Sequence, residues 1–477
     1  MIKHLALLLL LAGATPAFAG QAPGDAASPN IPVSSRDRFY TSDQFSNTVS
    51  VIDPATNKLL GVLRLGDPTP LNLSPLYRGQ LLVHGMGFSP DHRTLVVVSI
   101  GSNSVTFIDT ATNRIRHTSY VGRSPHEAFF TPDGREVWVT VRGEDYVQVL
   151  DGKTFEERGR ISVPNGPGMT IFAPDGRYAY VCSSFTPETV IIDVHSRQIV
   201  GHVAQVSPFC PDIAATPDGR QVWLTLKDTG KVMVFDAHPP FAVLKVLDTG
   251  PITNHVNIVR SGAGQFAYVT VGTENLVKVF RTDDFSQVAA IPVGSLPHGL
   301  WPSGDGSRIY VGLENGDAVA VIDTRTNRVI ATIPIGQAPQ GVAYVPDAVP
   351  TGDGLAGLEP LGVAAGSDKL ILAGAGPGPT TQVTLFDQGQ VQVLQAAVVG
   401  VRPMSAYVLA LSDAPDGSGP LQPLAAFMSN AAGSAIVDTV GPLRQVVASD
   451  TPAPRRYLVI AEVKPDALGA VVQRQQP

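Results

Sequence analysis

The sequence predicts an all-β fold, a seven-bladed β-propeller followed by a small C-terminal β-sandwich-like domain, and three observations lead to it. A strand-like segment recurs with a period of roughly 40–45 residues, which is typical of one propeller blade per repeat. Tight turns such as Pro132-Asp133-Gly134 follow many of these segments and favour short strands. The chain holds 47 glycines and 40 prolines while 44% of its residues are hydrophobic, a composition that suits many short strands rather than disorder. The repeated segments begin at His84, His126, Gly168, Pro211, His255, His298 and Gln340.

The segment after Ser124 shows the expected anatomy of one blade. An inner strand, His126–Phe130, precedes the Pro-Asp-Gly turn, and alternating β-rich strands follow at Glu136–Thr140 and Tyr146–Leu150. An outer strand around 158–163 completes the blade. The aspartate that ends the third strand recurs because its carboxylate can hydrogen-bond the backbone of the next turn.

The two ends of the repeat region complement each other. Residues 37–66 supply three strands but no inner strand, whereas residues 340–345 supply an inner strand with nothing after it. Joining them completes the seventh blade, closes the ring and removes a bare sheet edge. The sequence therefore predicts a propeller over residues 37–346.

Several motifs resemble the YVTN family of β-propellers, whose repeats are WD40-like. They are Tyr268-Val269-Thr270-Val271, Tyr180-Val181-Cys182, Val49-Ser50-Val51-Ile52-Asp53 and Ile291-Pro292-Val293-Gly294. Wider relatives with such repeats include the heavy chain of quinoprotein amine dehydrogenases, surface-layer-like proteins and haem d1 propellers. The resemblance implies the fold and leaves the activity open.

The first nineteen residues are typical of a Sec-type signal peptide. Lys3 and His4 precede an apolar run, and Ala17-Phe18-Ala19 is a cleavage motif, so we expect cleavage after Ala19 and a periplasmic or extracellular protein. Residues 20–36 are then an N-terminal linker. No later run is long and apolar enough to span a bilayer, so membrane insertion is not expected.

Charge and motifs exclude several classes of function. The net charge is −7, so the basic stripe that a nucleic acid requires is not expected. The sequence has no C-x-x-C-H haem motif, no P-loop and no G-x-S-x-G elbow.

Of the two cysteines, Cys182 ends the second strand of one blade and Cys210 begins the first strand of the next. Antiparallel strands place these two ends on one face, and an oxidising compartment favours a disulfide between them. Two separate buried thiols, each packing as a small apolar residue, are the alternative.

Histidines provide the candidate site. His84, His126, His255 and His298 share the start of the inner strand, and with Gln340 they form a contiguous arc at one mouth of the channel. Glu127 and Asp212 occupy the next position of the repeat and are expected to add carboxylates to the same mouth. Imidazoles that converge there can bind copper or zinc; alternatively, each histidine caps a strand end and hydrogen-bonds a neighbouring blade.

The remaining segments are a long connection and the C-terminal part. The connection, Gly66 to Leu82, predicts a loop that shapes the mouth. Residues 347–366 read as a linker and 367–477 as a β domain for docking or assembly, in which Leu421–Met428 is either a strand or a short helix.

We therefore expect a non-enzymatic binding or scaffold module that presents the channel mouth to a small ligand or a protein partner. The alternative is a metal-dependent or redox enzyme, or its propeller subunit, that uses the histidine arc.

Overall fold

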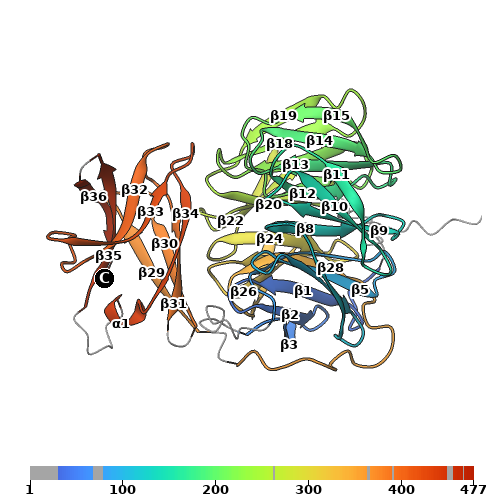
Figure 1. The fold of residues 1–477 in the computed structure, drawn as a ribbon, viewed down its shortest axis with the longest axis horizontal. Helices are drawn as coiled ribbons and strands as arrows, with labels where there is room; N and C mark the ends of the chain where they lie inside the picture. Colours follow the sequence, from blue (N-terminus) through green and yellow to red (C-terminus); the bar gives the residue numbers. More distant parts are fainter. Residues whose placement is uncertain are drawn as a thin grey trace, which may run out of the picture.

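The computed structural model describes residues 31–476 apart from 68–78, 262–263, 363–365, 389–390, 448–454 and 466. The expected signal peptide and most of the Gly66–Leu82 connection lie outside these residues. Figure 1 shows two bodies, a ring of four-stranded blades and a rolled sheet beside one of its faces. Among the described residues, no helix has the length and apolar character to cross a bilayer.

Seven four-stranded sheets form the ring, as the sequence predicted. Blade 1 consists of β28 (Pro339–Val345), β1 (Arg38–Asp43), β2 (Thr48–Asp53) and β3 (Lys58–Arg64). Blade 2 consists of β4 (Val83–Phe88), β5 (Thr94–Ser99), β6 (Ser104–Asp109) and β7 (Ile115–Tyr120). Blade 3 consists of β8 (Pro125–Phe130), β9 (Glu136–Val141), β10 (Tyr146–Asp151) and β11 (Glu157–Ser162). Blade 4 consists of β12 (Pro167–Phe172), β13 (Tyr178–Ser183), β14 (Glu188–Asp193) and β15 (Gln198–Ala204).

The other three blades repeat this plan. Blade 5 consists of β16 (Ile213–Ala215), β17 (Gln221–Leu226), β18 (Lys231–Asp236) and β19 (Val243–Asp248). Blade 6 consists of β20 (Thr253–Ser261), β21 (Gly264–Val271), β22 (Leu276–Arg281) and β23 (Gln287–Pro292). Blade 7 consists of β24 (Pro297–Pro302), β25 (Arg308–Leu313), β26 (Ala318–Asp323) and β27 (Arg328–Pro334).

Burial falls from the centre of the ring to its rim. Every residue of the inner strands β4, β8, β12 and β24 is buried, whereas the outer strands β7 and β11 are mostly exposed. The side chains of Trp138 and Trp223 are fully buried between neighbouring sheets. The core therefore lies between blades, and the inner strands present their first residues to the channel.

Blade 1 closes the ring with both ends of the repeat region. Strand β28 pairs antiparallel with β1, with Arg38 opposite Val345 and Tyr40 opposite Ala343. The Tyr344 hydroxyl donates a 2.5 Å hydrogen bond to Asp37 across this join. The predicted closure by two distant segments is thus present, and β28 pairs the edge of β1 that would otherwise be bare.

An irregularity at the start of the inner strand recurs around the ring. The pairing register shifts between Val83 and Met86 in blade 2 and between Pro125 and Ala128 in blade 3, with equivalent shifts in blades 4, 6 and 7. A β-bulge of this kind bends the strand and redirects side chains. It directs two consecutive residues per blade, such as His126 and Glu127, toward the channel mouth.

The segment after β28 runs along the outside of blade 1. The Val349 N–H donates to Arg36 O, and Val62 of β3 forms an antiparallel bridge with Glu359. Asn113 of blade 2 donates to the carbonyls of Gly354 and Ala356. The predicted linker is therefore packed on the propeller, and it leads the chain to the face where the inner strands begin (Figure 1).

The C-terminal domain is one rolled eight-stranded sheet. Its order is β33-β32-β35-β36-β29-β30-β31-β34, and the outermost strands β33 and β34 contact each other, so the sheet is nearly closed. The strands are β29 (Ser367–Ala373), β30 (Thr381–Asp387), β31 (Gln392–Val398), β32 (Ala406–Ser412), β33 (Leu421–Met428), β34 (Ala435–Gly441), β35 (Tyr457–Lys464) and β36 (Ala467–Gln475), with a short helix α1 (Arg444–Val447). Of the two alternatives for Leu421–Met428, the strand is present.

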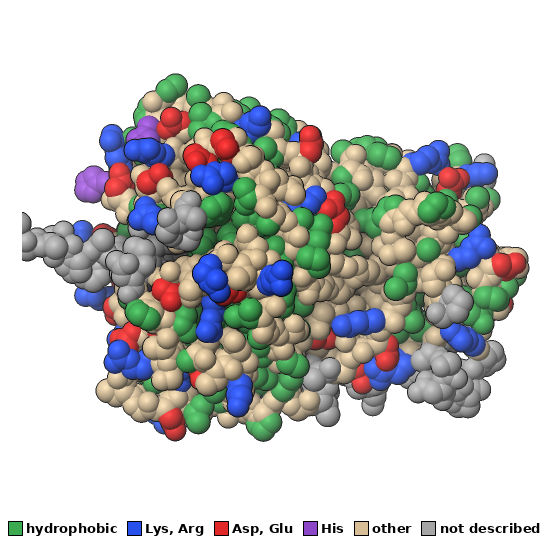
Figure 2. Space-filling view, turned by 180° about the vertical axis from the view of Figure 1, so that it is seen from behind, with side chains coloured by type: hydrophobic (Ala, Val, Ile, Leu, Met, Phe, Trp, Pro, Cys, Tyr) green, Lys and Arg blue, Asp and Glu red, His purple; other side chains and the backbone are tan. Residues whose placement is uncertain are grey.

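The rolled sheet packs on the mouth of the ring. The Phe45 ring of blade 1 contacts the Phe386 ring with centroids 5.0 Å apart. Leu296, between blades 6 and 7, packs with Ala397, and the Ala432 N–H donates to Asp228 O of blade 5. Blades 5, 6, 7 and 1 thus support the C-terminal sheet. In the opposite view of Figure 2, acidic and basic side chains are interspersed over the propeller surface.

Candidate functional site

The inner segment of each blade supplies two consecutive positions at the mouth. In three blades, a threonine of the second strand identifies the first position. Its hydroxyl donates a hydrogen bond to the backbone carbonyl of the first-position residue in the next blade: Thr140 to Gly168, Thr225 to Asn254 and Thr270 to His298. The first position therefore holds His84, His126, Gly168, Pro211, Asn254, His298 and Gln340.

This alignment corrects the position within the repeat that the sequence predicted for one histidine. Asn254 occupies the first position of blade 6, and His255 occupies the second, together with Glu127 and Asp212. The register supports this assignment, since the shift in blade 6 lies between Thr253 and Val256. His255 still faces the mouth, because its ring centroid lies 4.6 Å from that of His298. The arc of four histidines is therefore present, with its members on two levels.

His84 and His126 form the closest pair of the arc. Their Nε2 atoms are 3.0 Å apart, and Nδ1 of His126 donates to the Gly168 carbonyl at 2.8 Å. This hydrogen bond places the proton of neutral His126 on Nδ1 and leaves Nε2 as an electron-pair donor. Metal–nitrogen bonds of about 2.0–2.1 Å reach both Nε2 atoms at an angle of about 94° between the bonds, so an ion fits here with a small adjustment.

Glu127 completes a three-residue donor set. Ligand atoms of His84, His126 and Glu127 all lie within 4.8 Å of one another, and all three residues are buried. A Cβ atom at Gly85 would overlap the Glu127 carboxylate and the His126 carbonyl, so glycine at residue 85 gives the carboxylate its space. This group can hold a metal ion.

The other two histidines face carboxylates on the opposite side of the mouth. Nδ1 of His298 donates to the Gln340 carbonyl at 3.2 Å, and its Nε2 lies 4.0 Å from Oε2 of Glu314. Nδ1 of His255 lies 3.5 Å from Oδ2 of Asp212, which also accepts the Val256 N–H at 2.8 Å. The rings of His84 and His298, 6.4 Å apart, connect the two halves of the arc.

Burial sets the charge state of these groups. It lowers the pKa of His84, His126 and His255 well below the usual value and that of His298 to about 3, with the nearby cations Arg142 and Lys227 adding to the effect. The imidazoles are therefore neutral at pH 7 and keep a lone pair for a metal.

The two carboxyl groups at the second position shift in the opposite direction. Burial raises the pKa of Asp212 to about 8 and that of Glu127 well above its usual value, with Asp212 adding to the shift of Glu127. In the absence of a cation, these buried carboxyl groups hold their protons near neutral pH. A cation placed among them favours the carboxylate form, so its binding releases protons.

A second ring of polar residues surrounds the histidines, and the sequence reasoning missed it. The residue directly after the second strand is Arg142 in blade 3, Lys227 in blade 5 and Glu314 in blade 7. The C-terminal sheet adds Gln395 and Asp438, which interact with Glu314. Aligning the residues after each second strand could have identified the propeller members, whereas no local pattern points to the C-terminal pair.

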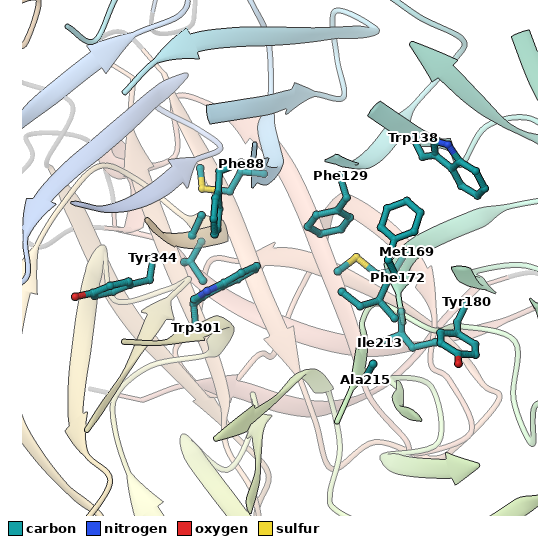
Figure 3. Packing of buried hydrophobic residues seen from close by; sticks show 14 of the residues in the cluster. Phe88, Phe129, Trp138, Met169, Phe172, Tyr180, Ile213, Ala215, Trp301 and Tyr344 are labelled. Carbon is teal, nitrogen blue, oxygen red and sulfur yellow. The ribbon is translucent and has the colours of Figure 1, made fainter. Parts of the chain in front are cut away.

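A small cavity of about 30 Å³ lies below the histidines, which is room for one or two water molecules. Glu127 and Asp212 line it together with Met86, Phe129 and Met169. In Figure 3, Phe129 and Met169 lie side by side near the centre of the ring, and the Phe88 ring faces that of Trp301 across 5.9 Å. The channel below the site is thus lined mainly by apolar side chains, and Asn257 joins Glu127, Asp212 and His255 as a polar residue at this cavity.

The break in the arc at blades 4 and 5 has a structural cause. A Cβ at Gly168 would lie 2.6 Å from Ser184 Oγ and 2.9 Å from the Cys210 carbonyl, so no side chain fits there. Cys182 and Cys210 are joined by a disulfide, with their Cα atoms 6.0 Å apart, and Pro211 follows directly. Ser184 and the backbone of Cys210 thus fill the space beside Gly168, and Pro211 holds the first position of blade 5 directly after the disulfide.

Comparison with known proteins agrees with this fold. A family model described as a YNCE-like beta-propeller matches residues 2–350. Hydrazine synthase of Kuenenia stuttgartiensis is similar in structure, with 21% identity, a TM-score of 0.51 and coverage of 56% of this chain and 90% of that chain. A functionally unknown protein from Desulfotomaculum acetoxidans has 14% identity and a TM-score of 0.54, covering 64% of this chain and 98% of that chain. None of the curated proteins matches.

Proposed function

Because this chain belongs to the YNCE-like β-propeller family, a fold that leaves the activity to its site, we propose that it is a binding module for a transition-metal ion such as zinc or copper. The ion is held at the channel mouth by His84, His126 and Glu127. The observation that carries the proposal is the convergence of three buried donor atoms within 4.8 Å, two of them on neutral imidazoles.

The position of the C-terminal sheet supports a small ligand over a protein partner. Strands β31 and β34 supply Gln395 and Asp438 to the mouth, so this chain's own domain already covers part of the surface on which a partner would dock. Arg142 and Lys227 at the same mouth are only partly buried, which leaves a path for an ion to reach the histidines. We propose a location outside the cytoplasm, which the Cys182–Cys210 disulfide supports.

A metal-dependent enzyme is the second candidate, and the size of the donor set favours it. Three protein ligands leave one position of a tetrahedral ion open, as in catalytic zinc sites, whereas structural sites are closed by four. In cobalt-substituted protein, added azide then changes the visible absorption spectrum. An unchanged spectrum assigns the site to binding alone.

Calorimetric titration of chelator-treated protein with zinc tests the proposal. We expect binding by the wild type and at least a tenfold loss of affinity in His126→Gln and in Glu127→Gln. The matched control is His202→Gln, because His202 is exposed on outer strand β15 and pairs with Glu188 there. Equal affinity in the wild type and both mouth variants contradicts the proposal.

A further inference from the structure

Three consecutive blades place a hydrogen-bond donor at the same position of the mouth. The residue directly after the second strand is Arg142 in blade 3, Ser184 in blade 4 and Lys227 in blade 5. Two of these side chains are cationic, and the third carries a hydroxyl. They follow one another around the ring at the break in the histidine arc, where blades 4 and 5 have Gly168 and Pro211 at the first position.

The three donors have no acceptor within the described part of the protein. The Arg142 guanidinium and the Lys227 ammonium make no hydrogen bond and no ion pair there, and the ammonium lies 5.9 Å from the centroid of the Phe209 ring. Oγ of Ser184 is buried and also has no hydrogen-bond partner among the described residues. A buried polar group without a partner costs free energy, so these groups call for an acceptor from outside the chain.

Ser184 lies between the blades that carry the two cations. A Cβ at Gly168 would lie 2.6 Å from Ser184 Oγ, and the Gly168 carbonyl accepts the Nδ1 proton of His126 in blade 3. On the other side, the disulfide between blades 4 and 5 fixes the segment that contains Phe209. The carbonyl of Phe209 accepts the Lys227 N–H at 3.0 Å. These contacts hold the three donor positions on one rigid side of the mouth.

The positive charge at this side is not balanced by an ionised partner. Burial lowers the pKa of Arg142, and the acid that acts on it, Glu127, holds its own proton near neutral pH. Burial also lowers the pKa of Lys227, while Glu314 and Asp228 offset this in part and Arg142 adds to it. An anion bound between the two cations relieves their repulsion and stabilises both charges.

We propose that this side of the mouth binds an oxyanion, held by the Arg142 guanidinium, the Lys227 ammonium and the Ser184 hydroxyl. The planar guanidinium presents paired N–H groups that match two oxygens of a phosphate, sulfate or carboxylate. The next two blades supply donors for the remaining oxygens. This chemistry is shared by a free inorganic oxyanion and by the anionic group of a larger organic ligand. The site stands on these three side chains and does not require the proposed metal ion.

Calorimetric titration of chelator-treated protein with inorganic phosphate, at constant ionic strength in sodium chloride, tests the site. We expect affinity to fall about tenfold or more in Arg142→Gln and in Lys227→Gln, and about fivefold in Ser184→Ala, because a hydroxyl contributes less than a charged donor. Arg142→Lys keeps the charge without the paired N–H groups and should bind with intermediate affinity. The matched control is Arg123→Gln, which removes an equal charge at an exposed Arg–Glu pair on the same face.

Thermal unfolding gives a second readout. Phosphate should raise the unfolding midpoint of the wild type and of Arg123→Gln and leave that of Arg142→Gln unchanged. Without phosphate, Arg142→Gln should be as stable as the wild type, because its guanidinium has no hydrogen bond to lose. Methyl phosphate distinguishes the two sources of the anion: tighter binding than phosphate indicates an organic ligand, and weaker binding indicates the free ion.

Two results overturn the proposal. One is a wild type that binds neither phosphate nor methyl phosphate, and the other is a loss of affinity as large in Arg123→Gln as in Arg142→Gln, which assigns binding to the general charge of the face. Because zinc is absent throughout, failure of the oxyanion site leaves the metal proposal intact. Zinc titration of His126→Gln tests that proposal separately.

Discussion

The disulfide between blades 4 and 5 allows a quantitative prediction of stability. Cys182 and Cys210 are fully buried, and the bond closes a chain segment with a sequence separation of 28. In the loop-closure treatment, a loop of this length removes about 12 cal/mol/K from the entropy of the unfolded chain, which is about 3.6 kcal/mol at 25 °C. Reducing the bond should lower the free energy of unfolding by this amount.

Urea unfolding of oxidised and reduced wild type measures the effect with all atoms retained. With an m-value of about 3 kcal/mol/M, the midpoint of the reduced protein should fall by about 1.2 M. The double variant Cys182→Ala, Cys210→Ala should lose somewhat more, because it also leaves a cavity at two buried side chains. A midpoint that moves by less than about 0.3 M on reduction, with an unchanged m-value, would refute the reasoning.

Two further predictions concern blade closure and the domain interface. Burial raises the pKa of Asp43 to about 7, above the ordinary value near 3.9, so ionisation costs stability as the pH rises through this window. The free energy of unfolding of the wild type relative to Asp43→Asn should therefore fall by up to about 4 kcal/mol between pH 4 and pH 8, and a difference independent of pH would contradict it. Replacing Phe386, which packs on Phe45, by alanine should cost about 3–5 kcal/mol at the interface and speed proteolysis of the connecting segment 347–366. Met404→Ala, at a side chain 69% exposed in the same domain, serves as the control, and equal proteolysis of both variants counts against a packed interface.

Much of the ring could be predicted because its strands pair with their neighbours in the sequence and recur at a fixed period. The Pro-Asp-Gly turns mark the boundary between the first two strands, and the predicted strands in the blade after Ser124 agree with β8 to β11 within about one residue at most ends. The closure by residues 340–345, observed as β28 (Pro339–Val345), followed from counting strands alone. The position predicted for His255 within the repeat was wrong because blade 6 has Ser261-Gly262 where blades 3, 4 and 5 carry Pro-Asp-Gly, so the usual turn was missing as a marker.

The rest of the site depends on contacts that no repeat encodes. Gln395 and Asp438 reach the mouth only because β31 and β34 pair and pack on the ring, far along the chain from Glu314. The C-terminal part was expected to be a sandwich, and its strands form one rolled sheet because β36 pairs with both β35 and β29. Such pairings follow from tertiary packing, and the alternation of residues within a strand does not determine them.

The closure of blade 1 by both ends of the ring also sets an order of events during synthesis. Strand β1 is complete at Asp43, but its partner β28 ends only at Val345. At about 5–20 residues per second, roughly 15–60 s separate the two on the ribosome. During that interval the first three strands carry an unsatisfied edge, and no complete channel exists. The arc of His84, His126, His255 and His298, which spans blades 2, 3, 6 and 7, can therefore assemble around one mouth only after translation of the ring has finished.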